Sequence, residues 1–243
     1  MEIKNQVELN ETILSSQVDF NQKLRFDAIL NIFQDVTTMH STLMGVSHDD
    51  MLKNSNAYWV LSKIKVKVQG EFRTGDEVLV KTWPLTPSVV RFNRGYEITK
   101  PNGEIVGHSE WCVLDAKTFR PRKFSTLSYP TMAHLEEKVS ISDFMRFTED
   151  FTEENFVLEH TNLFTDVDCN KHVNNVVYAK MALDVFGLEE FEEFNFNAFE
   201  IHFISQTFFG DKIKIYKKAY KDRVFVLGKK EEKPVFEALF YKE

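Results

Sequence analysis

Residues 167–172 read Val167-Asp168-Cys169-Asn170-Lys171-His172, and residues 18–23 read Val18-Asp19-Phe20-Asn21-Gln22-Lys23. In each stretch an asparagine follows an aspartate by two positions, and a pattern typical of a helix begins immediately afterwards. The two aspartates are separated by a fixed offset (168 − 19 = 149). This similarity predicts that the chain contains two copies of one structural unit.

A second pair of stretches supports the repeat. Gly75-Asp76-Glu77-Val78-Leu79-Val80 aligns with Gly210-Asp211-Lys212-Ile213-Lys214-Ile215, at a smaller offset (210 − 75 = 135). The second copy is therefore shorter between its helix and its sheet, where the first copy carries residues 41–56. Loops absorb such length differences at little cost in free energy.

The hydrophobic pattern predicts one helix and several strands in each copy. Apolar residues recur at three- and four-residue spacings from Leu24 to Val36, which indicates a largely buried helix. Alternation between turn residues predicts strands over 7–18, 59–68, 77–83, 89–99 and 104–114. Within the strand over 59–68, Lys63, Lys65 and Lys67 are expected on the wet face. The second copy repeats the order, with a strand over 156–165, a helix over 174–186 and strands over 199–208, 212–219, 223–228 and 234–241.

One helix followed by antiparallel strands, present twice, predicts an α+β fold. A long helix wrapped by a curved antiparallel sheet is a hotdog domain, so we expect two tandem hotdog domains that form an internal pseudo-dimer. The expected boundaries are 1–130 for the N-terminal domain, 131–154 for an acidic surface linker and 155–243 for the C-terminal domain.

Composition excludes several classes of function. The 243 residues include 30 basic and 37 acidic side chains, and a net charge of −7 disfavours nucleic-acid binding. Two cysteines, Cys112 and Cys169, provide neither a disulfide framework nor a set of zinc ligands, which fits a cytoplasmic protein. The N-terminus lacks the pattern of a secretory signal, and no stretch is long enough to predict a membrane span.

The candidate catalytic residues lie in the second copy of the turn. Asp168, Asn170 and His172 offer a carboxylate, an amide and an imidazole, each useful at a carbonyl carbon. N–H groups at the start of the following helix can hold an oxyanion. Asp-x-Asn before a helix is also an ordinary capping turn, and we assign that structural role to Asp19 and Asn21.

The second turn continues as Asp168-x-Asn170-x-His172-Val-Asn-Asn-x-x-Tyr178, which resembles the acyl-ACP thioesterases, and in particular their compact bacterial form. The first half agrees through Val18-Asp19-Phe20-Asn21, Trp59-Val60-Leu61, Thr82-Trp83-Pro84, Ser109-Glu110-Trp111 and Arg120-Pro121-Arg122. The resemblance implies a hydrolase that cleaves fatty acyl-acyl carrier protein during fatty acid biosynthesis, without metal or organic cofactor, and whose partner is acyl carrier protein. It implies catalytic roles for Asp168, Asn170 and His172, with Asp168 as nucleophile or as general base. It also implies an N-terminal domain that houses the acyl chain, so aromatic side chains there are candidates to line a tunnel: Phe26, Phe33, Tyr58, Trp59 and Trp111.

One position departs from the family. The plant enzymes have a glutamate followed by a cysteine on the strand after this helix, where this chain has Gln206-Thr207. Gln206 cannot act as a base, although it can hold a water molecule, so we include it among the catalytic residues in that role. Two alternatives follow: an acyl-CoA thioesterase on the same fold, and an acyl-binding module without turnover. The sequence allows a monomer or a homodimer, and it leaves the preferred acyl length open.

Overall fold

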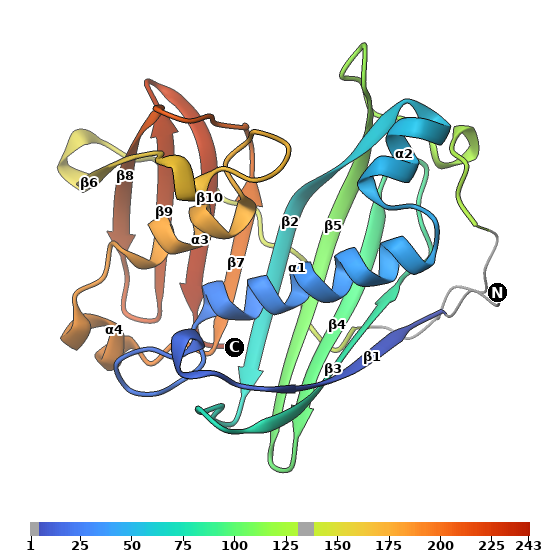
Figure 1. Ribbon diagram of the computed structural model, residues 1–243. Coiled ribbons are helices and arrows are strands. Elements are labelled where there is room, and N and C mark those ends of the chain that lie inside the picture. The colour runs from blue at the N-terminus through green and yellow to red at the C-terminus, as the bar shows by residue number, and fades with distance from the viewer. Residues whose placement is uncertain (1–4, 131–138) are drawn as a thin grey trace. The chain divides into compact units, whose positions relative to one another are not determined.

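The computed structural model describes residues 5–130 and 139–243, and the chain divides into two compact units, Met1–Ser142 and Asp143–Glu243 (Figure 1). The first unit contains β1 (Val7–Thr12), η1 (Ser15–Gln17), α1 (Phe26–Leu43), α2 (His48–Ser55), β2 (Ala57–Gln69), β3 (Glu77–Pro84), β4 (Phe92–Lys100), β5 (Gly103–Asp115) and η2 (Phe124–Thr126). Its strands pair antiparallel in the order β1-β3-β4-β5-β2.

The second unit repeats this plan. It contains η3 (Glu153–Asn155), β6 (Phe156–Thr161), η4 (Phe164–Asp166), α3 (Asn175–Leu183), α4 (Leu188–Phe194), β7 (Ala198–Phe203), β8 (Lys212–Ala219), β9 (Arg223–Lys230) and β10 (Lys233–Tyr241). Its antiparallel order is β6-β8-β9-β10-β7, which is the order of the first unit with each strand replaced by its counterpart. The predicted α+β repeat is therefore confirmed.

Helix α1 lies across the sheet of its unit, and it approaches the sheet closely where β5 has a glycine (Figure 1). The ring of Phe33, which is 1% exposed, occupies the space above Gly107 on β5. The same ring stacks on Tyr96 of β4 at a centroid distance of 4.3 Å. A glycine at this point lets the helix approach the sheet closely.

Helix α1 extends beyond the predicted pattern, as far as Leu43. The extension is rich in hydroxyl side chains, and these bond to carbonyl groups of the preceding turns. Thr38 Oγ1 donates to the Gln34 carbonyl at 2.9 Å, and Thr42 Oγ1 donates to the Thr38 carbonyl at 2.8 Å. Such residues break the apolar periodicity without ending the helix, because their hydroxyl groups find partners within it.

Several other sequence-based expectations were wrong in detail. The strand predicted over 7–18 ends at Thr12, the strand over 156–165 at Thr161, the strand over 199–208 at Phe203, and the helix over 174–186 at Leu183. Helices α2 and α4 were not predicted, because 8 and 7 residues are too few to establish a periodic pattern. A capping box between Ser47 and Asp50 begins α2, with Asp50 N donating to Ser47 Oγ at 3.2 Å.

The expected wet face of β2 is not uniformly wet. Lys65 is 0% exposed, and its Nζ donates to Ser142 Oγ at 2.6 Å. The alternating pattern could not show this, because the residues that cover the face come from a distant part of the sequence.

The acidic segment also contributes to a core. Residues 131–138 of the predicted linker lie outside the described residues. In the part that follows, Met145, Phe147 and Phe151 pack against a buried cluster of the second unit, which consists of Ala198, Phe225, Leu239 and Tyr241. Within residues 5–130 and 139–243, no helix combines the length and apolar character that a membrane crossing requires.

Replacing Gly107 with alanine should destabilise the protein by about 1–3 kcal/mol, because the new methyl group would collide with the confined ring of Phe33. Thermal and urea unfolding measure the loss. Gly187→Ala is the control, because no atom lies within 4 Å of its added Cβ. Gly187 is the N-cap of α4, so this substitution should lower the free energy of unfolding by less than about 1 kcal/mol, the effect of a weaker helix cap. Equal stability of Gly107→Ala and wild type would contradict this account of helix packing.

Candidate active site

The turn before α3 is built on the side chain of Asp168. Its Oδ1 accepts hydrogen bonds from the backbone N–H groups of Asn170 at 2.8 Å and His172 at 3.4 Å. The Asp168 N–H in turn donates to the His172 carbonyl at 2.8 Å. Lys171 completes the turn in the left-handed region, with φ 63°. The three candidate residues 168, 170 and 172 are therefore held in one short, closed loop.

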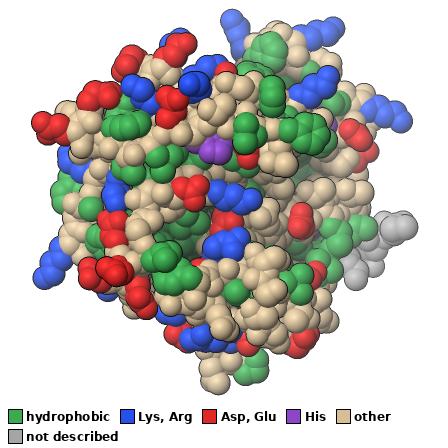
Figure 2. Space-filling view, turned by 60° about the vertical axis from the view of Figure 1, so that its left-hand side comes forward, with side chains coloured by type: hydrophobic (Ala, Val, Ile, Leu, Met, Phe, Trp, Pro, Cys, Tyr) green, Lys and Arg blue, Asp and Glu red, His purple; other side chains and the backbone are tan. Residues whose placement is uncertain are grey.

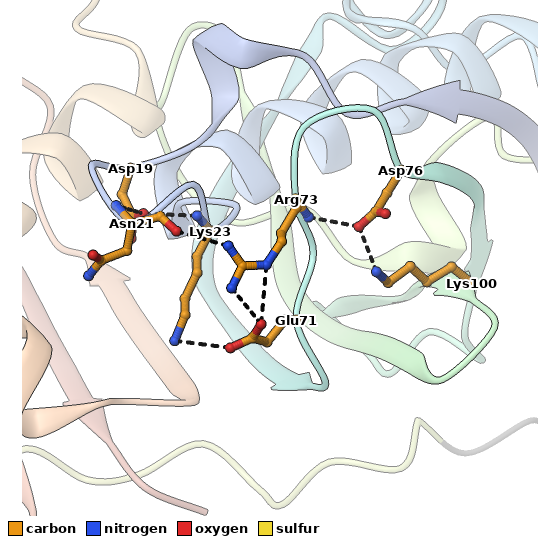
Figure 3. Close-up of polar contacts among 7 residues, drawn as sticks. All are labelled: Asp19, Asn21, Lys23, Glu71, Arg73, Asp76 and Lys100. Carbon is orange, nitrogen blue, oxygen red and sulfur yellow. Dashed lines mark hydrogen bonds and ion pairs between the residues drawn. The ribbon is translucent and has the colours of Figure 1, made fainter.

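The first unit contains the same turn. Asp19 Oδ1 accepts from the N–H groups of Asn21 at 2.8 Å and Lys23 at 2.9 Å, as Figure 3 shows. Gln22, the counterpart of Lys171, has φ 60°. The aspartate therefore shapes the backbone in both copies. In the first copy it forms a turn and differs from the expected helix cap, because the N-cap residue of α1 is Arg25. In the second copy this structural task occupies Oδ1 of Asp168 and leaves Oδ2 without a hydrogen bond to any residue of the described ranges.

The turn is joined to the segment that carries Gln206. Val173 N–H donates to the Thr207 carbonyl at 3.0 Å, which holds the turn against the segment that contains Gln206. The first unit shows that side chains at these positions can meet. There Leu24 N–H donates to the Phe72 carbonyl at 2.9 Å, and Lys23 Nζ lies 3.4 Å from Glu71 Oε1 (Figure 3).

The four predicted residues differ in exposure. Asp168 and His172 are half-buried, whereas Asn170 and Gln206 are exposed. The His172 ring packs edge-on against Phe208 at a centroid distance of 5.2 Å. Three residues thus share the turn, and the fourth lies on the adjoining segment.

The start of α3 differs from the expectation that its N–H groups are free for an oxyanion. Asn174 caps the helix, with its side-chain oxygen accepting from Val176 N–H at 2.9 Å. Asn174 N–H donates to the Asp166 carbonyl, and Val177 N–H donates to the Asn174 carbonyl, both at 2.9 Å. These donors are used within the unit, so the expectation was wrong for them.

A buried polar cluster beneath the turn was missed by the sequence analysis. Thr207 Oγ1 lies 2.8 Å from the Tyr178 hydroxyl and accepts from Asn162 Nδ2 at 2.9 Å. Thr207 N–H also donates to the Tyr178 hydroxyl at 3.1 Å. Asn162 and Thr207 are 0% exposed and Tyr178 is 3% exposed.

The first unit has an apolar cluster at the corresponding positions. Ile13, Ile29 and Phe72 stand where the second unit has Asn162, Tyr178 and Thr207. All three are buried, at 1%, 0% and 2% exposure. A residue-by-residue alignment of the two copies could have revealed this replacement of apolar residues by polar ones.

Burial raises the pKa of the Tyr178 phenol, and the negative charges of Asp211 and Asp168 raise it further, against the effect of its hydrogen bonds with Thr207. Tyr178 therefore stays protonated and neutral at physiological pH. No group of three histidine, cysteine or acidic side chains suited to a metal ion occurs in the described ranges.

The aromatic residues expected to line an acyl tunnel lie in the first unit. Phe26 and Phe33 are buried, and Tyr58, Trp59 and Trp111 are half-buried. Trp59 and Trp111 pack against the buried cluster of Met44, Val46, Met51, Ala57, Phe92 and Val113.

Arg94, on β4, was not expected to be buried in the first unit. It is 7% exposed, and its Nη1 lies 3.0 Å from His40 Nδ1 and donates to Thr82 Oγ1 at 3.3 Å. Burial lowers the pKa of its guanidinium.

Two family profiles match the chain. The acyl-ACP thioesterase N-terminal domain matches residues 5–127, and the acyl-ACP thioesterase C-terminal domain matches residues 149–237. Among individual relatives, acyl-[acyl-carrier-protein] hydrolase FATB1 of Cuphea viscosissima, a chloroplastic protein, is 26% identical over 198 residues, which cover 74% of this chain and 46% of the relative. Oleoyl-acyl carrier protein thioesterase 1 of Arabidopsis thaliana, also chloroplastic, is 23% identical over 71% of this chain and 52% of its own length. The chain thus spans about half the length of these curated relatives.

Solved structures show the same fold. An acyl-ACP thioesterase from Bacteroides thetaiotaomicron matches with a TM-score of 0.88 at 20% identity, covering 98% of each chain. The 12:0-ACP thioesterase from Umbellularia californica matches with a TM-score of 0.84 at 16% identity, covering 98% of this chain and 97% of that one. These likenesses confirm the double hotdog fold. Since the two family profiles cover both halves of the sequence, the chain belongs to the acyl-ACP thioesterase family.

Proposed function

We propose that this protein hydrolyses the thioester of fatty acyl-acyl carrier protein and releases a free fatty acid. Family membership supports the reaction class. The observation that carries the proposal is the asymmetry between two equivalent turns. The first turn places Lys23 in an ion pair with Glu71, whereas the second copy has an imidazole, His172, and an amide, Gln206, at the corresponding positions. Only the second turn carries an imidazole, which can donate and accept hydrogen bonds at a reacting carbonyl.

In the proposed mechanism, Asp168 acts as the general base through Oδ2, because Oδ1 is held by the backbone. Asp168 takes a proton from a water molecule, and the water oxygen bonds to the thioester carbonyl carbon. The carbon–sulfur bond then breaks, the fatty acid leaves, and Asp168 returns its proton to the phosphopantetheine sulfur, which regenerates the carboxylate. Gln206 holds the attacking water, Asn170 donates to the carbonyl oxygen, and His172 orients and polarises the reacting groups.

The buried polar cluster has a positioning role in this mechanism. Asn162, Tyr178 and Thr207 fix the backbone at residue 207, which both accepts from Val173 of the turn and follows Gln206. A hydrogen-bonded cluster holds a backbone more narrowly than apolar contacts do, because hydrogen bonds depend on direction. The apolar counterpart in the first unit needs no such precision.

The two domains divide the work in this proposal. Residues 1–130 bind the acyl chain, 131–154 link the domains, and 155–243 carry the catalytic residues. The cluster that includes Trp59 and Trp111 supports an apolar interior in the first domain. The free thiols of Cys112 and Cys169 support a cytoplasmic location, where thiols stay reduced.

An acyl-binding module without turnover is the second candidate. It is favoured by a single observation, the glutamine at position 206, where the resemblance to the plant enzymes implies a glutamate. Asp168 then remains the only carboxylate of the proposed catalytic set. The two functions differ in whether free fatty acid is released.

Replacing the candidate base and the imidazole should abolish hydrolysis. Asp168→Asn keeps an oxygen for the turn but loses the base, and His172→Ala loses the polarising ring, so we expect kcat to fall by about 10²–10⁴ in each. Release of free fatty acid from acyl-ACP measures the effect. Asp19→Asn and Lys23→Ala make equivalent changes in the first turn and should retain wild-type turnover. Equal losses from both turns would refute the assignment.

Gln206 is tested by two substitutions. Gln206→Ala removes a hydrogen bond to the attacking water and should lower kcat about tenfold, the effect of roughly 1.4 kcal/mol. Gln206→Glu keeps an acceptor at the position and should retain kcat within about threefold. A wild type that binds acyl-ACP without releasing product, together with an active Gln206→Glu, would favour the binding module instead.

The positioning role of the buried cluster predicts a selective effect on kcat. Thr207→Val removes the hydroxyl that accepts from Asn162 and should lower kcat about tenfold at constant KM, beyond a stability loss of about 1–3 kcal/mol. Thr207→Ser restores the hydroxyl and should recover most of kcat. Assays well below the melting temperature separate the two effects. If Thr207→Ser and Thr207→Val are equally impaired in kcat, the hydroxyl has no positioning role.

A further inference from the structure

Five exposed apolar side chains gather at one end of the second unit, and we call them the apolar rim. Figure 2 shows hydrophobic side chains standing among charged ones on one face of the molecule. The members of the rim and their exposure are Leu163 58%, Phe164 85%, Ile204 49%, Phe208 47% and Phe209 67%. Exposed apolar side chains grouped on neighbouring segments mark an interaction site more often than scattered single residues do.

The two segments that carry most of the rim are joined through Asn162. Asn162 Nδ2 donates to the Phe208 carbonyl at 3.0 Å, and Gly210 N–H donates to the Asn162 carbonyl at 2.9 Å. The segment that begins with Leu163 therefore runs beside the segment that ends with Phe209.

The first unit shows that the fold does not require these side chains. It has the same connections, including a Gly75 N–H bond to the Ile13 carbonyl at 2.8 Å. Yet Ser15, Gln69, Arg73 and Thr74 stand where the second unit has Phe164, Ile204, Phe208 and Phe209. Only the leucine position is shared, as Leu14 and Leu163. Four polar positions have thus become apolar in the copy that carries the candidate catalytic residues.

The rim borders those residues directly. Phe208 packs against the His172 ring at 5.2 Å, and Gln206 lies between Ile204 and Phe208 in the sequence. Phe164 precedes Asp168 by one short turn, in which Val167 N–H donates to the Phe164 carbonyl at 3.4 Å. A molecule that covers the rim is therefore placed at the mouth of the candidate active site.

We propose that the apolar rim is the surface on which acyl carrier protein docks when it delivers its thioester. This inference rests on the proposed function. A carrier protein brings a folded surface to the enzyme with each substrate molecule, and that surface can cover exposed aromatic side chains. Acyl carrier protein is acidic, and two lysines at the edge of the rim suit that charge. Lys171 is exposed, and Lys212 has a side chain that is 67% exposed and pairs with Glu159.

The rim does not suit a nucleotide carrier such as coenzyme A. Phosphate groups are recognised by guanidinium, ammonium and backbone N–H groups, and none of the five rim side chains offers a hydrogen-bond donor. The change from Arg73 to Phe208 between the two copies even removes a cation.

The test transfers the residues of the first unit to the second. Phe164→Ser and Phe209→Thr are made singly and together, and Leu188→Ser, whose leucine is 64% exposed on α4, is the matched control. Binding is measured with acyl carrier protein that carries its acyl group through a non-hydrolysable amide. Turnover is measured in parallel on acyl-ACP and on the matching acyl-pantetheine, which lacks the carrier protein.

Docking on the rim predicts that each variant weakens carrier binding about tenfold and raises KM for acyl-ACP, with kcat and acyl-pantetheine turnover unchanged within about twofold. Leu188→Ser should match wild type. Equal losses on acyl-pantetheine would overturn the proposal, because the rim would then contact the substrate arm. Unchanged carrier binding would also overturn it, including the case in which sedimentation shows that the variants dissociate a dimer. If wild type hydrolyses neither thioester, the proposed function fails, while the binding measurement still decides the docking site.

Discussion

An aspartate carboxylate that accepts two backbone N–H groups is the contact on which each unit of this protein depends. Asp19 and Asp168 make the same pair of hydrogen bonds and close the same turn immediately before the central helix. The turn sets where the helix begins and ties it to the segment after the neighbouring strand, through Leu24 or Val173. Because the backbone is fixed by the aspartate, the fifth residue of the turn can differ between the copies, as Lys23 and His172 do, and function can be placed there.

The two copies show how one scaffold is specialised. The first copy uses this freedom for an ion pair between Lys23 and Glu71 above an apolar cluster. The second copy has His172 and Gln206 above buried Asn162, Tyr178 and Thr207. Burying polar groups costs free energy unless they are hydrogen-bonded, and Thr207 uses both its hydroxyl and its N–H in such bonds. The exchange therefore trades apolar stabilisation for a defined geometry beneath the candidate catalytic turn.

Much of the fold could be predicted because its signals are local. The two offsets found in the sequence reappear as matching hydrogen bonds. Asp19 and Asp168 accept from the N–H groups of their turns, and Gly75 and Gly210 donate to the carbonyls of Ile13 and Asn162, the residues that follow β1 and β6. Helices α2 and α4 were not predicted, because each is short, is stabilised by caps and tertiary contacts, and shows no periodic pattern. The candidate site was predicted at Asp168, Asn170, His172 and Gln206, but the cluster that supports it was not, because Asn162, Tyr178 and Thr207 look like unrelated polar residues in separate segments.

The sequence by itself determined the repeat, the succession of helix and strands along the chain in each copy and the family motif, because alternation, periodicity and turn residues act over a few neighbouring positions. Only the tertiary structure decided which polar residues are buried together and which apolar ones are exposed. Lys65 became buried and Phe164 became 85% exposed for the same reason. The environment of a side chain is set by residues far away in the chain, and a single sequence does not show which of them pack against it.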